Sequence, residues 1–138
     1  MGRLLGLDHG SKRIGVAISD SSRLIATPYE VIVAAEALSV LDQILAQEDI
    51  DGIVIGLPTT LSGDESASTA AARQFAASVA AHTGLEVTLV DERFSTKVAE
   101  DVLIAGGMRR EKRRDIRDKM AATVILQGHL DSLRCPQP

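Results

Sequence analysis

Cysteine and aromatic residues are scarce in this sequence, and each scarcity excludes a class of function. Cys135 is the only cysteine, so neither a disulfide framework nor a thiolate metal site can form within one chain. The chain has no tryptophan, and its aromatic residues are Tyr29, Phe75 and Phe94. Three aromatic side chains are too few for a platform on which the bases of a single strand could stack.

Long apolar runs are also missing. No run approaches the roughly 18 residues that a membrane-spanning helix needs, and Met1 leads directly into strand-like sequence without the pattern of a signal peptide. We therefore expect a cytoplasmic protein with no membrane contact. The 138 residues, 45% hydrophobic and 25% charged, suffice for one packed domain but not for two. We expect a single domain over 1–138, with a flexible tail at 136–138.

Positive charge is unevenly distributed in a chain whose net charge is only −4. Seven of the fifteen lysines and arginines form one basic block: Arg109, Arg110, Lys112, Arg113, Arg114, Arg117 and Lys119. Such a block can be a solvated face or a contact for nucleic-acid phosphates, and its composition alone does not decide between the two.

The hydrophobic pattern predicts a β-hairpin at the start of the chain. Strands are expected at 3–8 and 13–19, and the link between them is only HGSK. Four residues cannot hold a crossover helix, so these strands are antiparallel neighbours, unlike the first strands of a receiver-like domain. A third strand is expected within 24–33, where Pro28 indicates an edge position or a bulge.

The rest of the chain alternates helices and strands. Helices are expected at 35–48, 66–82, about 95–105 and 115–133, and strands buried on both faces at 51–58 and 86–90. This order predicts an α/β fold with a mixed five-stranded sheet, in which an antiparallel meander of three strands precedes two strands parallel to the first. In such sheets, ligands gather at the carboxyl ends of the parallel strands.

Acidic residues stand at these strand ends. Asp8 ends the first strand, and Asp91 and Glu92 end the last. Carboxylates gathered in one pocket must be neutralised, by a shared proton or by a cation, and oxygen ligands suit Mg²⁺ or Mn²⁺. Which of Asp91 and Glu92 would face the metal stays open, because both faces of a buried strand are apolar.

Asp118 lies near the start of the last predicted helix. Ala121, Ala122 and Ile125 follow it at helical spacing, so Asp118 is predicted to face the sheet rather than water. The small alanines would let the helix approach closely and bring this carboxylate toward the strand ends. Two metal ions bound there could support phosphodiester cleavage, with the basic block contacting the phosphates.

The chain resembles the YqgF/RuvX type of the RNase H-like superfamily in four segments. These are GLDHGSKRIGVAISD at 6–20, IVIGLPTTLSGDES at 53–66, VDERFST at 90–96 and RDKMAATVILQGHLD at 117–131. The resemblance implies an RNase H-like fold and a metal-dependent nuclease. It would either process the 5′ end of pre-16S rRNA in ribosome biogenesis or act as a Holliday junction resolvase on branched DNA. A nucleic-acid-binding module without catalysis is the alternative from another class.

Carried over by position, the resemblance implies Asp8, Glu92 and Asp118 as catalytic carboxylates and as ligands of two Mg²⁺ or Mn²⁺ ions. Asp91 is the alternative to Glu92. The basic residues expected to contact nucleic acid are Lys12, Arg13, Arg93, Arg109, Arg110, Lys112, Arg113 and Arg114. The expected partner is structured RNA, such as pre-16S rRNA, or branched DNA, and the protein is expected to be a monomer or a homodimer.

Overall fold

The computed structural model describes residues 2–10, 12–57, 67–91 and 110–134, with the backbone alone at 67–68, 91, 110–118 and 134. Its strands are β1 (Arg3–His9), β2 (Arg13–Ser19), β3 (Ala26–Val33), β4 (Ile50–Leu57) and β5 (Glu86–Asp91). Its helices are the short 3-10 helix η1 (Ala34–Glu36), α1 (Ala37–Gln47), α2 (Ala67–Thr83) and α4 (Arg110–Arg134). The predicted helix at 95–105 and the predicted tail at 136–138 lie outside the described residues.

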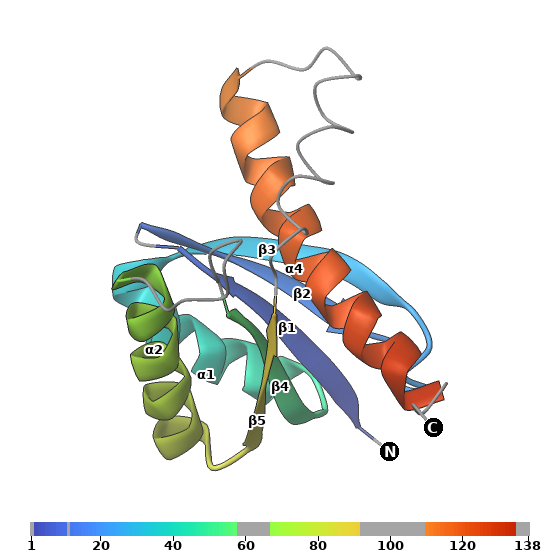
Figure 1. Cartoon of the computed structure of the whole chain (residues 1–138). Helices are drawn as coiled ribbons and strands as arrows, with labels where there is room; N and C mark the ends of the chain where they lie inside the picture. Colours follow the sequence, from blue (N-terminus) through green and yellow to red (C-terminus); the bar gives the residue numbers. More distant parts are fainter. Residues whose placement is uncertain (1, 11, 58–66, 92–109, 135–138) are drawn as a thin grey trace.

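The strands form one sheet in the order β3-β2-β1-β4-β5, between α4 on one face and α1 and α2 on the other (Figure 1). β1 pairs antiparallel with β2, which pairs antiparallel with β3. β4 runs parallel to β1, and β5 runs parallel to β4. The predicted meander followed by two parallel strands is therefore confirmed.

The sequence predicts an edge position or a bulge at Pro28, and the structure confirms both. β3 is an edge strand, and its register with β2 shifts where Val16 pairs with Glu30 but Ala17 pairs with Pro28. Tyr29 is thus the extra residue of a bulge. Because proline has no N–H to donate to a ladder, an edge position with a bulge accommodates it without a lost hydrogen bond.

The prediction that the last strand is buried on both faces is wrong. β5 is the second edge of the sheet, with Glu86 exposed and Leu89 37% exposed. β4, which lies between β1 and β5, is the strand that is buried almost throughout. A short run of Val and Leu has the same composition at an edge as at the centre, so the residues of β5 do not reveal how many neighbours it has.

α4 packs directly onto the backbone of β1. A Cβ atom placed on Gly6 would lie 2.7 Å from Cβ of Leu126 and 3.1 Å from the carbonyl oxygen of Ala122. The buried side chains of Ala121, Ala122 and Ile125 confirm the predicted apolar face of this helix. None of the helices in the described ranges is long and apolar enough to cross a membrane.

α4 begins at Arg110, five positions before the predicted start at 115. The backbone of most of the basic block therefore forms the first turns of a helix. Helix formers such as Glu, Lys and Arg dominate 110–117, and they favour this extension although they lack an apolar stripe.

Candidate active site

Asp8 lies near the carboxyl end of β1, on the face of the sheet that α4 covers. Leu4 belongs to the apolar cluster with α4, and Gly6 touches that helix. Since side chains two positions apart on a strand share a face, Asp8 points to the same side. It is half-buried, at the border between the α4 cluster and the open end of the sheet.

The two strands beside Asp8 both place a glycine next to it. Asp8 pairs with Gly15 of β2 and with Gly56 of β4. The same row continues to Val31 of β3 and to Val90 of β5. Asp8 is the one polar side chain in this row, and neither adjacent position carries a side chain. The two strand neighbours of Asp8 therefore place no side chain directly beside its carboxylate.

The end of β5 lies at the same edge of the sheet. Asp91 pairs with Leu57, one step beyond the row that contains Asp8, and only its backbone is described. Val90 packs against the α4 cluster, whereas Val87 packs against the cluster on the opposite face. Glu92 and Arg93 lie outside the described residues.

Asp118 is described by its backbone alone, within α4. One helical turn beyond it, Ala122 touches Gly6, and Gly6 precedes Asp8 by two positions. α4 runs antiparallel to β1, since Leu130 near its end clusters with Leu4 near the start of β1 (Figure 1). A turn of about 6 Å along the helix matches two strand residues of about 6.6 Å, so the backbone of Asp118 lies toward the level of Asp8.

His9 is the last residue of β1, and its side chain contacts α2 on the face of the sheet opposite to α4. Its ring stacks on Phe75 of α2, with 4.7 Å between the centroids and 28° between the planes. Burial lowers the pKa of His9 from its ordinary 6.5, against the opposing effect of the Asp8 charge. The imidazole is therefore neutral at about pH 7 and serves as a packing partner.

The histidines do not form a metal site in the described part of the chain. His82 bonds Asp42, with 2.9 Å between Nε2 and Oδ1, at the surface. Among the side chains that the structure describes, no group of three His, Cys, Asp or Glu could hold a metal ion. Of the three predicted metal ligands, the structure describes the side chain of Asp8 alone.

Two of the predicted phosphate contacts, Lys12 and Arg13, lie at the start of β2 near the Asp8 end of the sheet, and Lys12 is exposed. Arg93 and Arg109 lie outside the described residues. The remaining predicted contacts are described by their backbone only, in the first turns of α4: Arg110, Lys112, Arg113 and Arg114.

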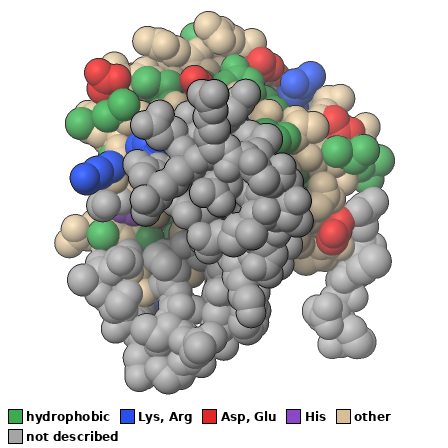
Figure 2. Space-filling view, turned by 90° about the horizontal axis from the view of Figure 1, so that it is seen from above, with side chains coloured by type: hydrophobic (Ala, Val, Ile, Leu, Met, Phe, Trp, Pro, Cys, Tyr) green, Lys and Arg blue, Asp and Glu red, His purple; other side chains and the backbone are tan. Residues whose placement is uncertain are grey.

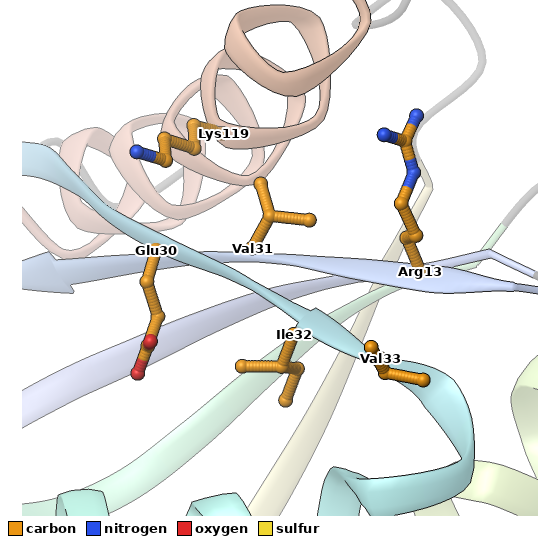
Figure 3. Close-up of a pocket in the computed structure, with 6 residues that line it drawn as sticks. All are labelled: Arg13, Glu30, Val31, Ile32, Val33 and Lys119. Carbon is orange, nitrogen blue, oxygen red and sulfur yellow. The ribbon is translucent and has the colours of Figure 1, made fainter.

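A pocket of about 380 Å³ lies on the β2 and β3 side of the Asp8 row. Its lining residues are Arg13, Glu30, Val31, Ile32, Val33 and Lys119 (Figure 3). Lys119 belongs to the basic block but not to the predicted contacts. No sequence signal places Lys119 over β3, because the position follows from contacts between α4 and β3 that join residues about a hundred positions apart.

Figure 2 shows the molecule from above the view of Figure 1, from the end at which α4 begins. Charged side chains of both signs are scattered over the described surface in this view. In the part of this face that the structure describes, neither sign forms a continuous patch. Attraction of a polyanion to these residues would therefore depend on individual cations rather than on a broad field.

A family model described as "RuvX: Holliday junction resolvase" matches residues 2–132. The chain belongs to the RuvX family. This RuvX chain is 39% identical over 136 residues to a protein of Lachnospira eligens, with 94% of this chain and 97% of that protein covered. It is 42% identical over 135 residues to a protein of Bacillus thuringiensis, covering 94% and 98%. Both relatives bear the name "Putative pre-16S rRNA nuclease".

Two solved structures resemble the RuvX chain over nearly its full length. RuvC of T. thermophilus in complex with a Holliday junction substrate has a TM-score of 0.58 at 14% identity, covering 98% of this chain and 97% of that one. The fowlpox virus resolvase with Holliday junction DNA has a TM-score of 0.57 at 12% identity, covering 95% and 98%. At such identities the likeness concerns the fold, and it confirms the predicted RNase H-like architecture.

Proposed function

We propose that this chain is a metal-dependent endonuclease that hydrolyses phosphodiester bonds in the 5′-end processing of pre-16S rRNA. The observation that carries the proposal is the placement of Asp8 at the carboxyl end of β1, between Gly15 and Gly56. Membership of the RuvX family and the shared name of relatives at about 40% identity support the reaction and the substrate.

The proposed metal ligands are Asp8, Glu92 and Asp118. Val90 supports Glu92 over Asp91, because it packs on the α4 face and side chains two positions apart on a strand share a face. The contact between Ala122 and Gly6 supports Asp118. Carboxylate oxygens suit Mg²⁺ or Mn²⁺. Two such ions, when bound, would activate water and stabilise the leaving oxygen.

A precursor of ribosomal RNA as substrate fits a cytoplasmic protein that acts as a monomer or a homodimer. The described helices, none of which could cross a membrane, are consistent with this location. The exposed Lys12 and the first turns of α4 supply the basic residues proposed to contact the RNA backbone.

A second candidate function is the resolution of Holliday junctions. The description of the family model and the fold shared with two resolvases favour it. A resolvase must cut two strands of a two-fold junction, so this function would require a homodimer. The two candidates use the same carboxylates and differ in substrate.

The test compares wild type with Asp8→Asn on pre-16S RNA and on a four-way DNA junction, each with Mg²⁺ or Mn²⁺. Asp8→Asn removes a metal ligand and should lower the rate of RNA cleavage by more than about 100-fold. Asp49→Asn is the matched control, because Asp49 is exposed and stands just before β4, at the opposite end of the sheet. Undiminished cleavage by Asp8→Asn would refute the proposed site, and cleavage of the junction alone would favour the second function.

A further inference from the structure

The pocket between α4 and the strands β2 and β3 carries two cations and lies beside the proposed catalytic row. We propose that it binds neighbouring backbone phosphates of the substrate strand, a short distance from the bond that is cut, one through Arg13 and one through Lys119. This inference rests on the proposed function, because it assumes that a nucleic-acid strand reaches Asp8 and assigns a second contact to that nucleic-acid strand.

The charges of the pocket are arranged on one side. Figure 3 shows Arg13, from β2, and Lys119, from α4, on the same side of the sheet as Val31, at opposite ends of the pocket with Val31 between them. Glu30 and Ile32 extend to the opposite side. The α4 side of the pocket therefore presents a guanidinium and an ammonium group above an apolar floor, and the one carboxylate among the lining residues points away from them.

The floor of the pocket belongs to the same row as Asp8. Val31 pairs with Gly15, and Gly15 pairs with Asp8. Two strand spacings of about 4.8 Å separate Val31 from Asp8, roughly 10 Å in all. Successive phosphates of one strand rise about 3.4 Å along the axis of a duplex and lie farther apart along the strand itself, so the pocket is within a few nucleotides of Asp8. The glycine between them leaves the path across the sheet without a side chain.

Lys119 is held over the pocket by the way α4 is attached to β3. Oε1 of Gln127 accepts a hydrogen bond from the Ala26 N–H at 2.8 Å, and its Nε2 donates to the Leu24 carbonyl at 3.0 Å. Thr123, between Gln127 and Lys119 on the same stripe, donates to the Lys119 carbonyl at 2.7 Å. Residues four apart share a helix face. Because Gln127 is bonded to residues at the start of β3, Lys119, two turns earlier in α4, lies over later residues of β3.

The lining chemistry matches a phosphate rather than a base. Arg13 offers a planar fork of donors and Lys119 a compact charge, both of which suit phosphate oxygens. Among the lining residues that the structure describes, the other side chains on this part of the pocket are aliphatic, with no ring for stacking and no amide for reading a base edge. The contact should therefore be independent of sequence and should strengthen binding through counterion release.

The test measures binding of intact substrate over a range of salt concentrations, with Asp8→Asn as the parent so that no cleavage occurs. Arg13→Gln and Lys119→Gln should each weaken binding about tenfold and reduce the slope of log K against log salt by roughly 0.7–0.9. The Asp8→Asn/Lys119→Arg protein should keep the slope of the parent, because it keeps the positive charge at position 119. Arg3→Gln is the control, since Arg3 pairs with Glu48 at 3.6 Å at the other end of β1.

The outcomes separate this inference from the proposed function. Unchanged slopes for both glutamine variants, or an equal loss in Arg3→Gln, would overturn the phosphate pocket while leaving the catalytic assignment intact. Cleavage by the Asp8→Asn parent would instead refute the proposed function. The pocket would be supported if the slope fell in the two glutamine variants alone and the Lys119→Arg variant kept the slope of the parent.

Discussion

Asp20 controls the turn between β2 and β3 through its side chain. Its Oδ1 accepts hydrogen bonds from the backbone N–H groups of Leu24 at 2.8 Å and Ile25 at 3.1 Å. Arg23, inside the turn, has a φ of 57°, which is uncommon for a residue with a Cβ. Its guanidinium compensates by bonding the Gly2 carbonyl at 2.9 Å and Asp51 at 3.1 Å. One carboxylate and one arginine thus hold this turn in place.

The hydrogen bonds to Asp20 predict that the free energy of unfolding falls at acidic pH. The N–H groups of Ile25 and Leu24 hold the pKa of Asp20 below its ordinary 3.8. Because the folded pKa is the lower one, this stabilisation is complete above 3.8 and is lost as pH falls through the folded value. Asp20→Asn keeps an acceptor oxygen that does not titrate, so it should show a smaller loss of unfolding free energy on acidification.

Urea unfolding at about pH 7 and about pH 3 measures this difference directly. Asp49→Asn again serves as the control, because the side chain of Asp49 is exposed. An equal acid-induced loss in wild type and Asp20→Asn would contradict the role assigned to the carboxylate.

At the scale of elements, the contact between β1 and α4 decides where the helix lies. Gly6 has no room for a methyl group, because Leu126 and the Ala122 backbone are too close. Gly6→Ala should therefore cost about 1–3 kcal/mol in unfolding free energy by overpacking. It should also slow cleavage, since a displaced α4 carries Lys119 and Asp118 away from Asp8.

Gly128 provides the matched comparison within the same helix. A Cβ there meets nothing within 4 Å, and the position is exposed in α4. Gly128→Ala should raise the unfolding free energy by about 0.5–1 kcal/mol through helix propensity alone. Denaturant unfolding and cleavage rates of the two alanine variants test this pair, and similar values for both would show that α4 is not seated on Gly6.

At the scale of the whole molecule, two apolar clusters hold the sheet without help from the proposed site. One joins β1, β2 and β4 to α1 and α2, and the other joins the sheet to α4. Asp8 belongs to neither cluster. The fold is therefore expected to persist without a metal ion, whereas the proposed reaction would require one.

Metal binding should then appear as added stability that depends on Asp8. A divalent ion at about a hundredfold its dissociation constant stabilises the native state by about 2.7 kcal/mol. Thermal unfolding with Mn²⁺ should show this gain in wild type and not at the same concentration in Asp8→Asn. Removal of metal by a chelator should stop cleavage without unfolding the protein. An equal gain in both proteins would mean that the ion binds elsewhere.

Local patterns predicted most elements of the fold, because the information lies within each segment. The link HGSK is too short for a helix, so the first two strands had to pair antiparallel. Pro28 marked an edge and a bulge for the equally local reason that it lacks an N–H. The exposure of β5 was not predictable in this way, since it depends on how many strands pair with it, and among the described strands only β4 does.

The sequence by itself determined that Asp8 ends a buried strand and that Ala121, Ala122 and Ile125 form a helix face able to approach the sheet. Only the tertiary structure decided which residues flank Asp8. Gly15 and Gly56 lie beside it through strand register, and Lys119 lies near Val31 because Gln127 fastens α4 to β3. Register and helix placement follow from packing between distant segments, whereas a strand or helix pattern is set by neighbours along the chain.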